Sequence, residues 1–309
     1  MEVTELIDLQ DKKGKTSTID HSVVLGSPRS GTTYLMRLLN TLPYCECLIG
    51  TLISSSIPQI AKQDIPQEIY NSLAVGFERS IDAYLHSGRF LSRAAALQKW
   101  MNAPSGFGGL VKAMKGKRTV RRMIYKEPFL SFAPDFVDKA LPDSQVIHIY
   151  RDGRDVANSL VRTYNVLTDE SLTSLNASEM RLGRKYDHRY VPWWVEIGEE
   201  ERFLQAPPYV RAIWMWKYMV GCCRDYYESE EVKRSGRVML LKYEDLMHDP
   251  FKYGMAVLEH FNEEPTPAYK KMLEKAHAKS IGKHKKRDPK EISEAEEVAR
   301  EELEFYGYL

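Results

Sequence analysis

The sequence predicts an α/β fold: a single three-layer domain in which helices cover both faces of a central parallel sheet. Short apolar runs alternate along the chain with longer segments of helical periodicity, and strands that alternate with helices favour a parallel sheet. A loop with glycines at positions 26 and 31 lies between the first apolar run and a helical segment, which is the order found in phosphate-binding folds. We expect a polar arm over 1–20 and the domain over 21–309.

Eight segments are predicted to have regular structure. The predicted strands, each a short apolar and β-rich run, are 22–25, 123–125, 145–150 and 237–241. The predicted helices, in which apolar residues recur with helical spacing, are 33–42, 69–86, 207–227 and 252–261. A glycine-rich loop over 103–117 and a long irregular segment over 167–208 interrupt the pattern. We interpret 167–208 as a substrate flap, because long loops inside compact domains are usually functional; a structural excursion is the alternative.

The loop after the first strand reads Gly26-Ser-Pro-Arg-Ser-Gly-Thr-Thr33. It matches the P-loop pattern G-x-x-x-x-G-K-[ST] except that Thr32 stands in the place of the lysine. Backbone amides and the helix dipole would still attract an anion, but the contact that serves a triphosphate is missing. Arg29 presents a planar fork of donors instead. The loop therefore indicates a phosphate site that uses an arginine in place of a metal.

The second motif follows the strand 145–150 and begins Arg151-Asp-Gly-Arg-Asp155, with Ser159 shortly after. It is a poor metal-binding Walker B motif, because Arg151 stands where the acid is needed and Asp152 fits only with a shift of one residue. A strand-end arginine and a serine in the first turn of a helix can share one phosphate. The alternative is a surface turn of ion pairs. Two anion sites at two strand ends predict a nucleotide phosphorylated at both its 5′ and 3′ positions.

The two loops and three further stretches of the sequence resemble those of a known family, the sulfotransferases that use 3′-phosphoadenosine 5′-phosphosulfate (PAPS). The stretches that resemble family motifs are SPRSGTTYL, IYKEPFLSF, YRDGRDVANSL, LLKYEDLMHDP and the final SIGKHKKRDPKEISEAEEVAREELEFYGYL. They follow the family's order from Val23 onward. The general likeness is to bacterial sulfotransferases of natural-product pathways, which sulfate carrier-bound β-hydroxyacyl chains or alkaloids.

The resemblance implies PAPS as the donor, adenosine 3′,5′-bisphosphate as the product, and no metal. It implies that Arg29 lies against the sulfonate, that Lys126 approaches the bridging oxygen, and that Tyr243 lies near the adenine. The 5′-phosphate would be held by Ser30, Gly31, Thr32 and Thr33. The 3′-phosphate would be held by Arg151 and Ser159, with Gly282 and Lys283 closing over it.

The general base departs from the family patterns. Related enzymes place a glutamate after the first helix, but this position falls near Thr51 here, and Glu46 is too early. Glu127, beside Lys126, and His188, in the flap, are the two candidates, since a carboxylate or an imidazole can serve. The alternatives are an ion-pair partner for Glu127 and a surface histidine for His188. His148 is expected in the core.

The acceptor is expected to be an apolar or planar small molecule, or a carrier-bound chain, with a hydroxyl that receives the sulfonate. The aromatic residues that indicate this are Tyr186, Tyr190, Trp193, Trp194, Trp214 and Trp216. An acidic carrier could dock on Arg181, Arg184, Lys185 and Arg189, which are otherwise a solvated face.

Composition limits the partners. The net charge of +1 argues against nucleic acid as a partner. We expect a cytoplasmic protein without a membrane partner, because apolar runs of about 18 residues and a secretory signal are both lacking. Four cysteines in two close pairs are expected to be reduced thiols. The competing functions are a P-loop kinase or NTPase and a nucleotide-binding module without catalysis; the oligomeric state stays open.

Overall fold

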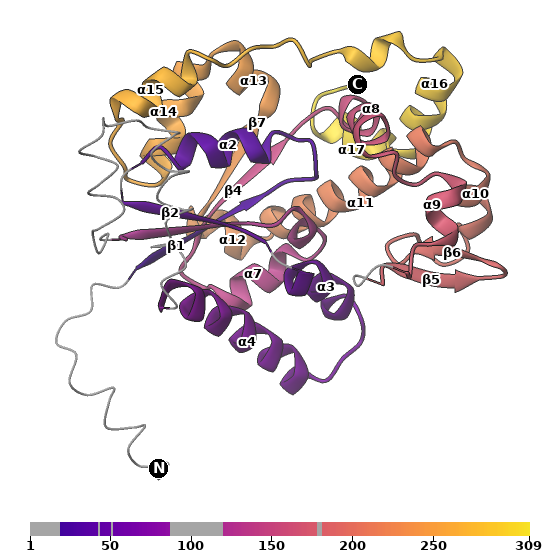
Figure 1. Ribbon diagram of the computed structural model, residues 1–309, viewed down its shortest axis with the longest axis horizontal. Helices are drawn as coiled ribbons and strands as arrows, with labels where there is room; N and C mark the ends of the chain where they lie inside the picture. Colours follow the sequence, from indigo (N-terminus) through magenta and orange to yellow (C-terminus); the bar gives the residue numbers. More distant parts are fainter. Residues whose placement is uncertain (1–18, 43, 51, 87–119, 178–180) are drawn as a thin grey trace.

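The computed structural model describes residues 19–42, 44–50, 52–86, 120–177 and 181–309. Within these residues a five-stranded parallel sheet has the order β2-β3-β1-β4-β7, and a two-stranded antiparallel sheet pairs β5 with β6 (Figure 1). The strands of the large sheet are β1 (Asp20–Leu25), β2 (Cys45–Ile49), β3 (Arg122–Lys126), β4 (Gln145–Tyr150) and β7 (Val238–Lys242). The predicted fold class, a three-layer α/β domain with a central parallel sheet, is confirmed.

Alternate residues of the strands face two separate cores, as the period of a strand requires. Val24 of β1 and Ile147 of β4 belong to the core under α2 (Thr32–Leu39), α13 (Tyr243–His248), α14 (Pro250–His260) and α15 (Pro267–Leu273). Val23 and Val146 belong to the opposite core. That core lies under α4 (Gln67–His86), α7 (Pro134–Ala140), α8 (Gly153–Tyr164), α11 (Pro208–Glu228), α16 (Pro289–Val298) and α17 (Arg300–Phe305).

The four predicted strands and four predicted helices are all present, with ends that differ by no more than three residues. The prediction omitted β2, whose short Cys-Glu-Cys-Leu-Ile run forms one edge of the sheet. The segment 167–208 is not irregular, since it contains α9 (Asp169–Thr173), the hairpin of β5 (Gly183–Tyr186) and β6 (Arg189–Pro192), and α10 (Glu200–Gln205). The glycine-rich stretch 103–117 lies outside the described residues.

The order of the strands determines where a ligand binds. The chain builds β1, β2 and β3 on one side of the sheet and then crosses to β4 and β7 on the other side. The switch lies between β1 and β4, and open α/β sheets bind ligands at the carboxyl ends of the strands at such a point. The two predicted phosphate loops follow these two strands and so lie together.

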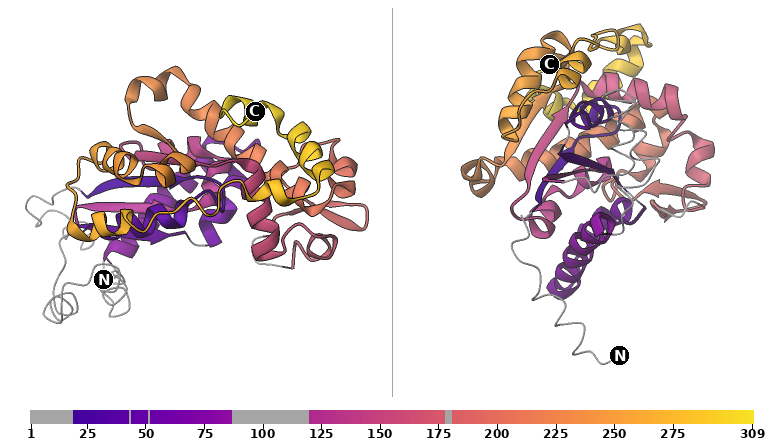
Figure 2. Two further views of the ribbon diagram at one scale, coloured as in Figure 1. Left: turned by 90° about the horizontal axis from the view of Figure 1, so that it is seen from above. Right: turned by 60° about the vertical axis from the view of Figure 1, so that its left-hand side comes forward.

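The remaining short elements are α3 (Leu52–Ala61), η2 (Pro128–Phe132), α12 (Glu230–Ser235) and η3 (Lys283–Lys286). The segment that joins α15 to α16 contains η3 and runs along the molecule beside α8 (Figure 1, Figure 2). None of the described helices is both long and apolar enough to cross a membrane.

Candidate active site

The loop between β1 and α2 depends on its two glycines. Gly26 and Gly31 have φ angles of 145° and 101°, in the region that favours glycine. A Cβ at Gly26 would lie 2.3 Å from the carbonyl oxygen of Ile149, and one at Gly31 would lie 2.4 Å from a ring carbon of Tyr243. Within the loop, the hydroxyls of the buried Ser27 and Ser30 lie 2.6 Å apart. The loop therefore packs tightly on β4 and α13, and the first turn of α2 opens beside it.

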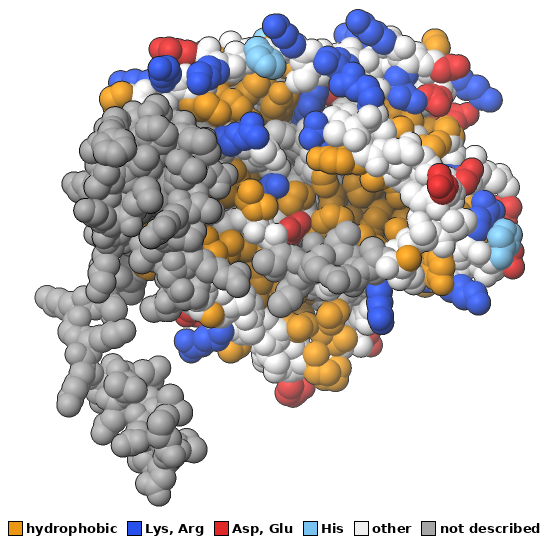
Figure 3. All heavy atoms as spheres, in the orientation of Figure 1, with side chains coloured by type: hydrophobic (Ala, Val, Ile, Leu, Met, Phe, Trp, Pro, Cys, Tyr) orange, Lys and Arg blue, Asp and Glu red, His pale blue; other side chains and the backbone are white. Residues whose placement is uncertain are grey.

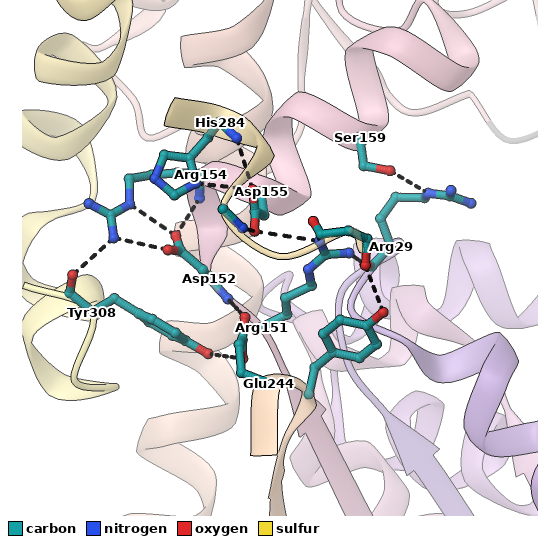
Figure 4. A network of polar contacts seen from close by, with 12 residues as sticks. Arg29, Arg151, Asp152, Arg154, Asp155, Ser159, Glu244, His284 and Tyr308 are labelled. Carbon is teal, nitrogen blue, oxygen red and sulfur yellow. Dashed lines mark hydrogen bonds and ion pairs between the residues drawn. The ribbon is translucent and has the colours of Figure 1, made fainter. Parts of the chain in front are cut away.

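Arg151, at the end of β4, lies opposite this loop and is almost fully buried (Figure 4). Its guanidinium donates to the carbonyl oxygens of Arg29 (3.2 Å) and Ser280 (2.5 Å), and lies 4.6 Å from the ring centroid of Tyr243. Its Nε finds no hydrogen-bond partner among the described residues. A buried charged donor without a partner costs free energy unless an anion satisfies it, so this site fits a phosphate.

A cavity of ≈ 240 Å³ separates the two loops. Of the ten residues predicted to bind the nucleotide, eight line it: Arg29, Gly31, Thr32, Thr33, Arg151, Ser159, Tyr243 and Lys283. The other two, Ser30 and Gly282, do not line it, but each is next in the sequence to a residue that does. The prediction omitted five further lining residues, Tyr34, Asp155, Asn158, Arg162 and Ser280. Arg162 comes three residues after Ser159 and four after Asn158 in α8, so helical spacing could have revealed Arg162.

Asp155 attaches the late segment of the chain to this cavity. Its carboxylate accepts hydrogen bonds from the amides of Gly282 (2.6 Å) and His284 (3.0 Å) and lies 3.0 Å from Nδ1 of His284. It also lies 3.5 Å from the guanidinium of Arg151. Burial raises the pKa of Asp155, but these hydrogen bonds and Arg151 together bring it below its usual value. The ionised Asp155 thus holds Lys283 at the cavity.

Arg29 stands between this cavity and a second one. Its Nε donates to the hydroxyl of Ser159 at 2.9 Å (Figure 4). Its Nη1 donates to the hydroxyl of Tyr164 at 3.4 Å. Arg29, Thr32 and Thr33 line both cavities. A group bound in one cavity therefore meets a group bound in the other at Arg29.

The second cavity has a volume of ≈ 680 Å³ and is mainly apolar. Figure 3 shows apolar side chains gathered in a hollow near the middle of one face. The segment 167–208 contributes Leu167, Ser171, Leu175, Leu182 and Trp194 to its lining. Other apolar lining residues are Pro28, Phe129, Leu160, Val166 and Met215. Lys126 and Glu127 also line it and, with Arg29, supply its charged groups within the described residues.

Lys126 is the last residue of β3, Glu127 follows it, and both are buried. One carboxylate oxygen of Glu127 accepts the amide hydrogen bond of Phe129 at 3.1 Å and so caps η2. The other oxygen lies over Gly50, where an added Cβ would be only 2.0 Å away. Burial raises the pKa of Glu127, although the hydrogen bond from the Phe129 amide and the charge of Lys126 both act to lower it. Burial has the opposite effect on Lys126: it lowers the pKa of the ammonium group, although the charge of Glu127 acts to raise it.

The other predicted base, His188, is placed elsewhere. It lies in the exposed turn of the β5–β6 hairpin, where Nδ1 is 2.5 Å from Asp187, and it lines neither cavity. His148 is in the core, as predicted, and burial lowers its pKa to about 3. Glu46 is buried in β2 and lines neither cavity. Position 51 lies outside the described residues.

Most of the aromatic residues that were expected around the acceptor do not line the second cavity. Trp194 alone among them lines the second cavity, where it stacks on Phe132. Trp214 and Trp216 are fully buried in α11. The indole of Trp216 packs on Gly153 and donates to the carbonyl oxygen of Arg151 at 3.1 Å. It therefore supports the 151–155 motif from behind.

Asp152, the possible metal ligand of the second motif, is already engaged. Its two carboxylate oxygens accept from Nε (3.0 Å) and Nη2 (2.9 Å) of Arg154. Among the described residues, no group of three or more His, Cys, Asp or Glu side chains is arranged to hold a metal. In the predicted carrier patch, the guanidinium of Arg184 forms an ion pair with the carboxylate of Glu200 at 2.5 Å, while Arg181 and Lys185 are exposed.

Residues 23–205 match a family model described as "Sulfotransferase family". Similar solved structures include the sulfotransferase STF9 from Mycobacterium avium, with 16% identity over 98% of this chain and 80% of that chain and a TM-score of 0.47. The sulfotransferase domain of the curacin biosynthetic pathway has 17% identity over 82% and 77% of the two chains, with a TM-score of 0.40. That of the Synechococcus PCC 7002 olefin synthase has 16% identity over 93% and 90%, with a TM-score of 0.42. No curated protein matches this chain.

Proposed function

The chain belongs to the sulfotransferase family, and from this premise we propose that it transfers the sulfonate of PAPS to the hydroxyl of an apolar acceptor. The observation that carries the proposal is the pair of cavities that meet at Arg29. The smaller cavity is lined by four cationic side chains and by residues of the first turn of α2, and the larger one is mainly apolar. Such a pair fits a doubly phosphorylated nucleotide on one side and a weakly polar alcohol on the other.

The first cavity would hold the donor through two groups of residues. The amides at the start of α2 would receive the 5′-phosphate, because a helix N-terminus attracts anions. Arg151, Ser159 and Lys283 would receive the 3′-phosphate; the unsatisfied Nε of Arg151 supports this assignment. Tyr243, packed on Gly31 and Arg151, would lie near the adenine.

PAPS would supply an activated sulfonate, and the residues around Arg29 would supply charge and orientation. Arg29, at the shared wall, would lie against the sulfonate oxygens. Lys126 would approach the oxygen on which charge grows as the bond to the nucleotide breaks. Fixed cations that meet developing charge lower the barrier more than they stabilise the ground state.

Glu127 is our proposal for the general base. It lines the acceptor cavity beside Lys126, whereas His188 lies in an exposed turn outside it. Burial raises the pKa of Glu127, which brings the carboxylate closer to the value of an effective base at neutral pH. It would accept the proton of the acceptor hydroxyl as the new S–O bond forms.

The acceptor would be an uncharged, mainly apolar alcohol. The cavity offers leucine, valine, methionine, phenylalanine and tryptophan side chains along its walls, and its charged groups within the described residues are Arg29, Lys126 and Glu127. An isolated small molecule and a carrier-bound chain both satisfy this description. For a carrier, Arg181 and Lys185 would remain available at the surface.

Two assays test the proposal. Adenosine 3′,5′-bisphosphate should raise the melting temperature much more than ATP with Mg²⁺, since a ligand stabilises the state that binds it. Radiolabelled PAPS should then give label transfer to long-chain and aromatic alcohols, and little to their carboxylate analogues. Stabilisation by ATP–Mg²⁺ alone would support a kinase or NTPase, and bisphosphate binding without transfer to any alcohol would support a binding module.

A further inference from the structure

Tyr308, the second residue from the end of the sequence, lies against the base of the proposed 3′-phosphate site (Figure 4). It follows α17, and Gly307, with a φ angle of 72°, precedes it. The Nζ of Lys242 lies 4.4 Å from the centroid of its ring. Residues far apart in the sequence thus meet beside the turn that carries Arg151.

The hydroxyl of Tyr308 is connected to that turn through one buried carboxylate. It donates to Oε2 of Glu244 at 2.9 Å, and Oε1 of the same carboxylate accepts from the amide of Asp152 at 3.1 Å. Glu244 belongs to α13, directly after Tyr243. The carboxylate therefore bridges Tyr308 to the peptide that follows Arg151.

The carbonyl of Tyr308 makes a second connection. Nη2 of Arg154 donates to this oxygen at 2.9 Å, while the same guanidinium holds both carboxylate oxygens of Asp152. Arg154 also lies 2.5 Å from Glu296 of α16. Asp152 is thus held twice, at its amide through Glu244 and at its carboxylate through Arg154, and both paths end on Tyr308.

We propose that Tyr308 is a positioning residue for Arg151, holding the Asp152 peptide so that the neighbouring guanidinium faces the first cavity. This inference rests on the proposed function, because it assigns Arg151 to the 3′-phosphate. Within the described residues, the tip of Arg151 is anchored by two carbonyl oxygens, Asp155 and the ring of Tyr243. Loss of the Tyr308 connection would let its backbone move while the 5′-phosphate loop stays in place.

The test compares Tyr308→Phe with the parent protein in two measurements. Hydrogen exchange of the Asp152 amide, measured without nucleotide, should accelerate about fivefold, because Glu244 loses one of its donors. The dissociation constant for adenosine 3′,5′-bisphosphate should rise about fivefold, and that for 5′-AMP should stay within about twofold. In turnover, KM for PAPS should rise and kcat should hold.

Tyr226→Phe is the matched control. The hydroxyl of Tyr226 also donates to a carboxylate, Asp138, at 2.6 Å, but Tyr226 lines neither cavity of the candidate site. It should alter neither Asp152 exchange nor the ratio of the two nucleotide affinities.

Three outcomes decide the inference. Unchanged Asp152 exchange in Tyr308→Phe would overturn it, as would an equal loss of affinity for both nucleotides. A parent protein that does not prefer the bisphosphate to 5′-AMP would instead refute the assignment of Arg151, and with it the proposed function. In that case the exchange measurement still shows whether Tyr308 holds the turn.

Discussion

Replacing Glu127 by glutamine separates the two things that this side chain would do. Its Oε1 caps η2 through the amide of Phe129 at 3.1 Å, and a glutamine oxygen of nearly the same size can keep that bond. The amide cannot accept a proton from the acceptor. We therefore expect turnover to fall roughly 10²–10⁴-fold, the usual contribution of a general base, which is about 2.7–5.4 kcal/mol of barrier. Binding of adenosine 3′,5′-bisphosphate should not change.

The pH dependence adds an independent check. Burial raises the pKa of Glu127, more than the amide of Phe129 and Lys126 lower it, so the acidic limb of the rate profile should lie above the ordinary value of a glutamate. A raised folded-state pKa gives stability that is present at low pH and is lost as the pH rises through it. Glu127→Gln removes this loss, so its free energy of unfolding at neutral pH should equal or exceed that of the parent in urea titrations.

The assay is single-turnover transfer from radiolabelled PAPS at saturating acceptor, measured across the pH range. His188→Ala is the control, and its exposed position predicts an unchanged kcat. If Glu127→Gln keeps turnover within about threefold of the parent and the same acidic limb, Glu127 is not the base. A collapse in His188→Ala instead would restore the histidine, and unchanged turnover in both variants would show that neither residue is the base.

Three further predictions test other parts of the site. Arg151→Ala should remove most of the preference for adenosine 3′,5′-bisphosphate over 5′-AMP in calorimetry, since hydrogen bonds to charged groups contribute about 1.5–3 kcal/mol each; a retained preference would contradict the 3′-phosphate assignment. Gly50→Ala should lower kcat about tenfold or more with unchanged bisphosphate binding, because its methyl group would lie 2.0 Å from the carboxylate of Glu127; normal kcat would show that this carboxylate can move without loss. EDTA should leave the transfer rate unchanged, because Arg29 and Lys126 would supply the positive charge; a collapse reversed by Mg²⁺ would favour the kinase.

The positions of the two loops that we assign to the phosphates could be predicted because their signals are local. Gly26 and Gly31 are needed where φ is positive and where β4 and Tyr243 approach the loop. Arg151 and Ser159 are eight residues apart on one strand–helix turn. A parallel sheet then brings the two loops together, since consecutive strands end at the same edge. The resemblance to a family rests on these same short stretches.

The features of the site that only the tertiary structure could show are those that depend on contacts between segments far apart in the sequence. The sequence by itself determined the alternation of strands and helices, without β2 and the elements within 167–208, and the residue types of the two loops assigned to the phosphates. It did not distinguish Glu127 from His188, because the distance of each from the acceptor cavity follows from the packing of the 167–208 segment. It did not show that Trp194 lines the second cavity while Trp216 lies in the core, since an aromatic residue in the sequence is compatible with either position. Nor could it show that Tyr308 reaches Asp152 through Glu244, because side chains at the far end of the chain meet β4 only after α16 and α17 pack on α11.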